Sequence, residues 1–353
     1  MTQNFSYAGS PAQIVFGAGS MSRVAEWVAK AGRKQALVLS TPHQKADAEA
    51  LAKEIGSLAC GVFSGATMHT PVEVTNEAMR MVAQTGADSV ISLGGGSTTG
   101  LGKAIAYRTD LLQIVIPTTY AGSEVTPILG QTEGGRKTTV RDARILPEIV
   151  IYDAALTLGL PVAMSVTSGL NAMAHAVEGL YAQDRNPISS LMALEGLSAF
   201  ARSLPVIVND PMNTEARSDA LYGAWLCGSV LGTVGMALHH KICHTLGGSF
   251  DTPHAETHAV MLPHTAAFNA AAAASELAGA ADIFGGSIGG GLWDFASGLG
   301  SPLSLKEFGL TEADLDRAAE IAVENPYWNP RPIDRGAIRQ LLQNAWEGRR
   351  PTD

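Results

Sequence analysis

The sequence contains few cysteines and no pattern of paired cysteines. Cys60, Cys227 and Cys243 are odd in number and widely spaced, which predicts reduced thiols and a cytoplasmic protein. The first residues contain neither a basic segment nor an uninterrupted apolar run, so we expect no secretory signal. The alanine-rich stretch at 266–285 is interrupted by polar residues, and it predicts a packed helix instead of a membrane span.

Basic residues are also scarce, since 24 Lys and Arg stand against 33 Asp and Glu, for a net charge of −9. This balance argues against nucleic acid or an anionic membrane as a partner, because both require a basic surface. An anionic small molecule would need local basic groups. With 46% apolar and 16% charged residues, the composition is that of a folded globular protein. The 353 residues exceed what one hydrophobic core usually organises, so we predict two domains.

Apolar runs and helical patterns alternate in the first half of the chain. We predict strands at 35–40, 60–63, 88–93, 111–117 and 148–153, with helices at 44–55 and 72–85 between them. This alternation predicts a parallel sheet covered by helices. After Asp153 the pattern becomes helical to the end. We therefore predict an α/β dinucleotide-binding domain at 1–157 and an all-α domain that carries the substrate and catalytic residues at 158–353.

The segment DSVISLGGGSTTGLGKAIAY at 88–107 predicts a strand, a glycine turn and a helix. Gly94, Gly95, Gly96 and Ser97 would let a ligand approach the backbone at the start of that helix, where unpaired amides attract phosphate. We interpret this turn as a diphosphate cradle, with a purely structural turn as the alternative. Lys103, further along the helix, is predicted to lie on the surface.

The strand at 35–40 is followed by Ser40, Thr41, Pro42 and His43. An enzyme restricted to NAD would place an acidic residue here to bind the ribose 2′-hydroxyl. At these positions there is no carboxylate that would repel the 2′-phosphate of NADPH and no arginine that would require it. We therefore expect Ser40 to line a site that accepts NADH or NADPH, with NADH slightly preferred.

Six of the nine histidines lie in MALHHKICHTLGGSFDTPHAETHAVMLPH at 236–264. His240 and His244 are four residues apart, so on a helix they share one face. Asn171 and His175 have the same spacing in SGLNAMAHAVEGLY at 168–181. Such a concentration of imidazoles indicates a chemical site, and taken alone it predicts a metal. We interpret His239 and His258 as packing or hydrogen-bonding residues.

The order HxxxHxLGG, His254 and LPH, together with GGGS and PTTYAGSEVTP at 117–127, resembles the iron-containing alcohol dehydrogenase family. That family shares the dehydroquinate synthase-like fold. The resemblance implies cofactor contacts at Thr118, Thr119 and Ser123, with Thr138 near the nicotinamide ribose. Metal-dependent members of the family use an Asp and three His, whose positions are occupied here by Asn171, His175, His240 and His254.

The asparagine at position 171 removes the charged metal ligand. One carboxylate contact to a divalent ion is on the order of several kcal/mol even at an effective ε of about 20. We therefore expect no bound metal, although three imidazoles can hold zinc.

Within the family, MHTPVEVTNEA at 68–78 and NPYWNPRP at 325–332 look most like the maleylacetate reductases. This resemblance implies a homodimer that reduces the carbon–carbon double bond of a dicarboxylate, maleylacetate, to 3-oxoadipate in aromatic-compound catabolism of the resorcinol or hydroxyquinol type. His244 is then the first candidate for the proton donor and His240 the second. Lys241 either binds a substrate carboxylate or faces solvent. His175, His254 and Asn171 complete the expected catalytic set.

Two other functions remain open at this point. The first is a metal-dependent alcohol dehydrogenase acting on a small alcohol or aldehyde. The second is a nucleotide-binding sensor in which the histidines are structural.

Overall fold

The structure, a computed structural model, describes residues 5, 7, 9, 12–134 and 136–353. The chain forms two compact units, Gly9–Leu160 and Pro161–Asp353, and the second also includes the described residues Phe5 and Tyr7. We call the unit that ends at Leu160 the α/β unit and the unit that begins at Pro161 the helical unit. Each is described by itself.

The α/β unit contains a six-stranded parallel sheet in the order β1-β8-β5-β4-β2-β3. Its strands are β1 (Gln13–Phe16), β2 (Ala36–Leu39), β3 (Ala59–Phe63), β4 (Ser89–Gly94), β5 (Leu112–Pro117) and β8 (Ile149–Tyr152). The five predicted strands are confirmed, and β1 was missed. An antiparallel pair, β6 (Ile128–Glu133) and β7 (Arg136–Arg141), was also missed. The polar sequences of β6 and β7 contain no apolar run that predicts a buried strand.

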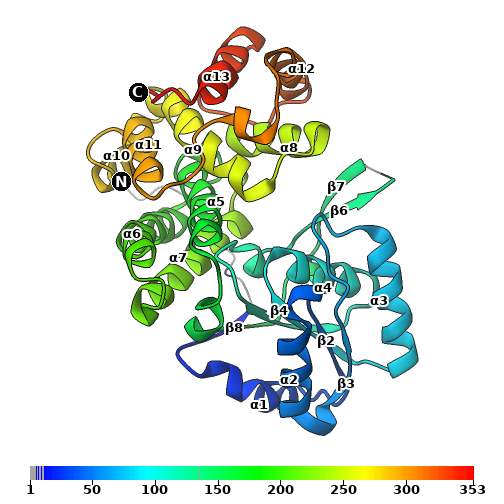
Figure 1. Ribbon diagram of the computed structural model, residues 1–353. Coiled ribbons are helices and arrows are strands. Elements are labelled where there is room, and N and C mark those ends of the chain that lie inside the picture. Colours follow the sequence, from blue (N-terminus) through cyan, green and yellow to red (C-terminus); the bar gives the residue numbers. More distant parts are fainter. Residues whose placement is uncertain (1–4, 6, 8, 10–11, 135) are drawn as a thin grey trace. The chain divides into compact units, whose positions relative to one another are not determined.

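Helices cover both faces of this sheet (Figure 1). Because side chains alternate along a strand, Val38 packs in one apolar cluster with α1 (Val24–Lys30) and α2 (Lys45–Ile55). Leu37 and Leu39 pack in the opposite cluster with α3 (Val72–Thr85) and α4 (Gly96–Thr109). The predicted helices at 44–55 and 72–85 are therefore confirmed as α2 and α3.

The strand order reverses between β2 and β4. From β2 the chain continues to β3 on one side, and from β4 it continues to β5 on the other. Ligands of parallel α/β sheets bind at the carboxyl ends of the strands where such a reversal occurs. Ser40 follows β2 and the glycine turn ends β4, so both segments singled out in the sequence lie at this position.

The segment before α3 has an unusual backbone. His69 and Thr70 have φ values of 64° and 46°, which place both in the left-handed region that non-glycine residues rarely adopt. The Thr70 side chain lies against Gly100 of α4, where an added Cβ would be 2.4 Å from Thr70 Oγ1. The glycine at position 100 therefore makes room for this segment.

The helical unit confirms the prediction that the second half is built from helices. Its helices are α5 (Val162–Tyr181), α6 (Pro187–Asn209), α7 (Thr214–Thr233), α8 (Leu238–Phe250), α9 (His254–Ala270), α10 (Ala274–Ile283), α11 (Ile288–Gly298), α12 (Glu312–Val323) and α13 (Arg335–Glu347). Every residue of α5 from Ser165 to Tyr181 is buried. The alanine-rich stretch at 266–285 forms the end of α9 and all of α10, as predicted for a packed helix.

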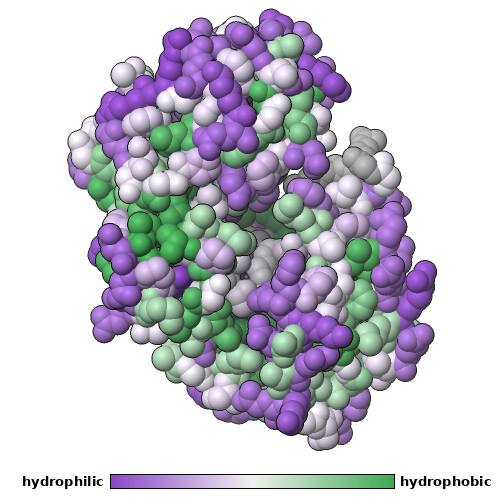
Figure 2. Space-filling view, viewed as in Figure 1, coloured by the Kyte–Doolittle hydropathy of each residue, from purple (hydrophilic) through white to green (hydrophobic). Residues whose placement is uncertain are grey.

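Helix α6 is a long apolar helix that is only partly buried. It is long and apolar enough to cross a membrane, but 44% of its most apolar stretch is buried inside the protein, as in a core helix of a globular domain. Its exposed apolar side chains include Leu191, at 66% exposure. Figure 2 shows apolar side chains gathered where Figure 1 draws α6.

Candidate active site

The three glycines after β4 serve different purposes. Gly94 has a φ of +152°, and an added Cβ there would lie 2.4 Å from Thr98 Oγ1. A Cβ on Gly95 would lie 2.7 Å from Thr119 Cγ2, whereas a Cβ on Gly96 would meet nothing within 4 Å. Packing therefore requires glycine at positions 94 and 95 but not at 96. The open space at Gly96, the first residue of α4, fits a phosphate at a helix N-terminus.

We expect Gly96→Ala to separate ligand binding from folding. The added methyl group has room within the protein, so the melting temperature should stay within about 2 °C of wild type, the shift of a few tenths of a kcal/mol. NADH affinity should fall at least about tenfold, or ~1.4 kcal/mol, because the methyl group occupies the space of the diphosphate. Calorimetric titration with NADH measures this.

Gly298→Ala is the matched control, because a Cβ there also meets nothing within 4 Å. Unchanged NADH affinity in Gly96→Ala would mean that the turn is only structural.

Lys103 is not on the surface, contrary to the sequence prediction. It is 2% exposed, and its Nζ donates hydrogen bonds to the carbonyls of Ser123, Thr126 (2.8 Å) and Ile128 (3.0 Å) and to Thr126 Oγ1 (2.9 Å). Burial lowers the pKa of Lys103 to about 7, while the nearby Glu124 carboxylate acts in the opposite direction. The lysine thus holds the loop that follows β5. Its position among Ala104, Ile105 and Ala106, all fully buried, is the sequence signal that could have revealed it.

Most of the predicted cofactor residues lie at the carboxyl ends of strands. Ser40, fully buried after β2, donates a hydrogen bond from Oγ to Ser64 Oγ (3.0 Å). Gln44 Nε2 donates to Thr118 Oγ1 (3.1 Å), which links the segment after β2 to the loop after β5. Thr119 lies against Gly95. Gln44 was missed in the sequence because its partner is 74 residues away.

The remaining cofactor predictions fall elsewhere. Ser97 is in the first turn of α4, and Ser123 belongs to the short helix Ser123–Val125 in the loop held by Lys103. Thr138 is exposed on β7, outside the six-stranded sheet, with its Oγ1 3.5 Å from the Gln131 carbonyl. The described contacts do not join Thr138 to the strand-end residues.

Three helices of the helical unit bring the histidines together. Helix α5 supplies His175, α8 supplies His239, His240 and His244, and α9 supplies His254 and His258. His175 Nδ1 and His240 Nε2 are 3.0 Å apart. The His258 ring centroid is 4.5 Å from that of His254 and 5.1 Å from that of His240. The sequence therefore identified the correct segments, and the histidines form one cluster.

Two predicted residues occupy the edge of this cluster. The His244 ring is 6.0 Å from that of His240, and its Nδ1 is 3.4 Å from the Tyr327 hydroxyl. Lys241, half-buried on α8, follows His240 directly. On α5, Asn171 is buried, and its Oδ1 has no hydrogen-bond partner. An amide oxygen without a donor can accept from a ligand.

Burial decides which of these groups can exchange protons near pH 7. Burial and the neighbouring imidazoles lower the pKa of His239 and of His258 well below the ordinary value. Burial lowers the pKa of His264 to about 4. These three rings are neutral near pH 7 and cannot serve as acids. Burial and the charge of Glu178 raise the pKa of the Cys243 thiol, so this thiol stays protonated.

Glu178 is a residue of this site that the sequence reading missed. It lies on α5 three residues after His175 and is 1% exposed. Its carboxylate accepts hydrogen bonds from the backbone N–H groups of Ala237 (2.9 Å) and His239 (2.7 Å), and it lies 2.6 Å from His240 Nδ1. A single acidic residue inside the apolar run HAVEGLY, at helical spacing from His175, was the available signal.

The residues at the family's metal positions do not fit a divalent ion well. Asn171 supplies no charge, and the facing nitrogens of His175 and His240 already bond to each other. Among the described residues, three ligand atoms within 4.8 Å of one another come only from His239, Cys243 and His258. There His239 Nε2 bonds to His258 Nδ1 at 2.9 Å, beside a thiol that burial keeps protonated. We derive no catalytic step through a metal.

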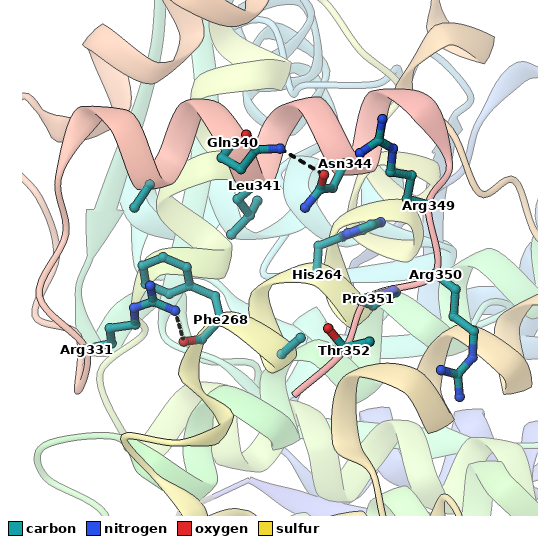
Figure 3. A pocket seen from close by; sticks show the side chains of 12 residues that line it. His264, Phe268, Arg331, Gln340, Leu341, Asn344, Arg349, Arg350, Pro351 and Thr352 are labelled. Carbon is teal, nitrogen blue, oxygen red and sulfur yellow. Dashed lines mark hydrogen bonds between the residues drawn. The ribbon is translucent and has the colours of Figure 1, made fainter.

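A cavity of about 390 Å³ lies elsewhere in the helical unit, between α9, α13 and residues 349–352 (Figure 3). Three arginines line it, but each has a partner within the protein. The Arg331 guanidinium stacks on Phe268 and donates to its carbonyl (3.1 Å). Arg349 pairs with Glu347, and Arg350 pairs with Asp294. Because these cations are neutralised or stacked, we do not place a substrate carboxylate here.

Family models match both units. The model described as "Iron-containing alcohol dehydrogenase" matches residues 11–154, and the one described as "Fe-containing alcohol dehydrogenase family, C-terminal" matches residues 165–346. The chain belongs to the iron-containing alcohol dehydrogenase family. The resemblance proposed from the sequence is therefore confirmed.

Relatives within the iron-containing alcohol dehydrogenases are closely similar over the full length. A maleylacetate reductase of Rhizobium sp. (strain MTP-10005) is 65% identical over 349 residues, or 99% of each chain. One of Burkholderia cepacia is 54% identical over 96% of this chain and 97% of the relative. The crystal structure of maleylacetate reductase from Agrobacterium tumefaciens has a TM-score of 0.97 at 65% identity, covering 99% of this chain and 100% of that one. This similarity confirms the predicted fold class.

Proposed function

We propose that this member of the iron-containing alcohol dehydrogenase family reduces the carbon–carbon double bond of maleylacetate with NADH or NADPH to give 3-oxoadipate. The observation that carries the proposal is the 65% identity to a maleylacetate reductase over 99% of both chains. The asparagine at position 171 also supports it over the alternative, a metal-dependent alcohol dehydrogenase. Reduction of a simple carbonyl gains most from a bound cation, and the donors present fit one poorly.

The chemistry requires a hydride and a proton. NADH or NADPH, when bound, supplies a hydride to the alkene carbon β to the ketone. The electron pair of the double bond then forms an enolate, which the protein must hold by hydrogen bonds. A protein acid returns a proton to the carbon next to the ketone. The protein's part is therefore to orient the enedioate, donate hydrogen bonds to one oxygen and deliver one proton.

In the proposed mechanism, the proton comes from His244 or, as a second choice, from His240. Lowered pKa values leave His239, His258 and His264 neutral near pH 7, which supports the choice of an acid outside these three rings. His175, His254 and the amide of Asn171 orient the substrate and help to hold the enolate. Lys241 pairs with a substrate carboxylate, a role for which a half-buried cation next to His240 is suited.

The remaining parts of the proposal concern the protein's state. We propose a homodimer in the cytoplasm with no resident metal and with neither nucleic acid nor membrane as a partner. The three cysteines are free, and the net charge is −9. Exposed apolar side chains on and after α6, including Leu191 and Met212 at 66% and 64% exposure, supply a surface of the kind that a second copy covers.

The decisive experiment follows NADH oxidation by the purified protein with freshly generated maleylacetate, with and without a strong chelator. We expect one NADH to be consumed per maleylacetate, full activity in the chelator and less than stoichiometric metal by elemental analysis. Turnover of simple aldehydes that chelation abolishes and iron or zinc restores would identify an alcohol dehydrogenase instead. Binding of NADH without turnover of either substrate class would favour the nucleotide-binding sensor.

A further inference from the structure

We propose that Glu178 is a positioning residue that fixes which nitrogen of His240 carries a hydrogen, and through His240 fixes the same choice for His175. The proposal deepens the proposed function, because His240 and His175 belong to the proposed catalytic set. Glu178 itself is too deeply buried to be the acid that meets the substrate. Its effect is exerted through the two rings.

Both carboxylate oxygens of Glu178 face hydrogen-bond donors of the protein. Oε1 accepts from the His239 amide and Oε2 from the Ala237 amide, and both amides lie at the start of α8, where the helix dipole attracts negative charge. An ionised carboxylate can only accept hydrogen bonds.

The hydrogen positions on the two imidazoles follow from this acceptor. His240 Nδ1 lies 2.6 Å from Glu178 Oε2, so Nδ1 must carry a hydrogen. In the neutral ring Nε2 is then an acceptor. His175 Nδ1 lies 3.0 Å from that Nε2, so His175 must donate from Nδ1. One buried carboxylate thereby fixes the direction of two successive hydrogen bonds, from His175 to His240 and from His240 to Glu178. We call these two bonds the relay.

A rotation or tautomer change of His240 would reverse this relay. Nε2 would then carry the hydrogen, and His175 Nδ1 would have to accept it. The hydrogen on the outer nitrogen of the second ring would change as well, which alters what the pair offers to an enolate oxygen. A carboxylate that orients an imidazole in this way is a recurring device in catalytic sites.

Glu178→Gln is the informative substitution because it keeps the shape and removes the second acceptor oxygen. If the glutamine oxygen accepts from His239, its NH₂ group meets both the Ala237 amide and His240 Nδ1. The NH₂ group then favours an unprotonated Nδ1 on His240. In the opposite orientation the oxygen keeps its contacts with Ala237 and His240 Nδ1, and the His239 amide loses its acceptor instead. One backbone amide loses its acceptor in either orientation, so some loss of stability is expected too.

Asp153→Asn controls for this loss of stability. Asp153 is 2% exposed and accepts from the backbone amides of Met21 and Ala155, both at 3.1 Å. It therefore undergoes the same chemical change at a buried carboxylate that caps backbone amides. Its substitution should lower the melting temperature and leave the His240 tautomer as it is.

The test combines ¹⁵N NMR of the imidazoles, assigned with His240→Gln, with kinetics. Wild type should show the Nδ1–H tautomer of His240 without any substrate present. Glu178→Gln should shift it to Nε2–H and lower kcat about 10²-fold, the scale of general acid–base catalysis, with KM and NADH affinity within about threefold of wild type.

An Nε2–H signal in wild type would overturn the proposal without recourse to any variant. An unchanged tautomer in both Glu178→Gln and Glu178→Leu, which offers no acceptor in any orientation, would also overturn it, as would an activity loss no larger than that in Asp153→Asn at equal stability. The NMR result does not depend on maleylacetate, so failure of the proposed function would be seen separately as wild-type protein without turnover.

Discussion

Lys103→Met is expected to destabilise the α/β unit and to abolish measurable NADH binding. Methionine fills much of the same volume but donates no hydrogen bond, so the carbonyls of Thr126 and Ile128 would lose the lysine as their donor. The Ser123 carbonyl would keep its bonds from the Thr126 amide and hydroxyl. An unsatisfied buried group costs about 1–3 kcal/mol. Two such groups together lead us to expect a loss of roughly 2–5 kcal/mol in the free energy of unfolding.

Chemical denaturation measures the stability change, and calorimetric titration with NADH measures binding. Lys53→Met is the control, because Lys53 is an exposed residue of α2 and its replacement should leave both quantities within about 0.5 kcal/mol of wild type. The proposed role of Lys103 would be contradicted if Lys103→Met lowers the free energy of unfolding by less than about 1 kcal/mol, a typical single-site effect. Water or a rearranged side chain would then supply the hydrogen bonds, and the loop would not depend on the lysine.

Removal of the His244 or the His240 side chain should lower catalytic activity severely and should not make the enzyme dependent on added metal. His244→Ala should lower the turnover number about 10²-fold or more, the usual contribution of a general acid. His240→Ala should lower it further, since it breaks the contacts to both Glu178 and His175. NADH affinity should persist in both variants, and added iron or zinc should rescue neither. Steady-state kinetics with maleylacetate, with and without added metal, test these outcomes.

Tyr327→Phe is a useful companion variant. It removes only the hydroxyl that lies 3.4 Å from His244 Nδ1, and at that distance the hydrogen bond is weak. We expect less than a tenfold loss of turnover. Near-normal turnover in His244→Ala would remove that histidine from the mechanism, and metal rescue of His240→Ala would restore the metal-dependent alternative.

The main sheet was predictable because its buried strands are continuous apolar runs. In β4 and β5 almost every side chain is buried, so the sequence alone indicated them. In β6 and β7 polar residues pair across a two-stranded ribbon, and their pairing depends on hydrogen bonds that leave little apolar pattern. Strand β1 is short and half exposed. It lies at the edge of the sheet because it pairs with β8. In that pairing Gln13 lies beside Ile149, which is 136 residues later in the chain.

The sequence predicted which histidines form the cluster, but not which ring nitrogen contacts which partner. Helical spacing placed His240 and His244 on one face, and the segments on α5, α8 and α9 do meet. Which nitrogen faces which partner depends on how three helices pack, and this information is not local. Glu178 and Lys103 were missed or misplaced for a common reason. Charged residues are usually exposed, and only the tertiary structure shows the acceptors or donors that make their burial tolerable.

The contact between Thr70 and Gly100 means that substitutions at these two positions, 30 residues apart, depend on each other in evolution. Thr70 holds its left-handed backbone in space that any side chain at position 100 would fill. A substitution at Gly100 alone is therefore unfavourable, whereas the same substitution joined to a reshaped segment at 69–70 avoids the clash. The two positions should change together among descendants of this chain, and chimeras built from relatives should exchange both in one step.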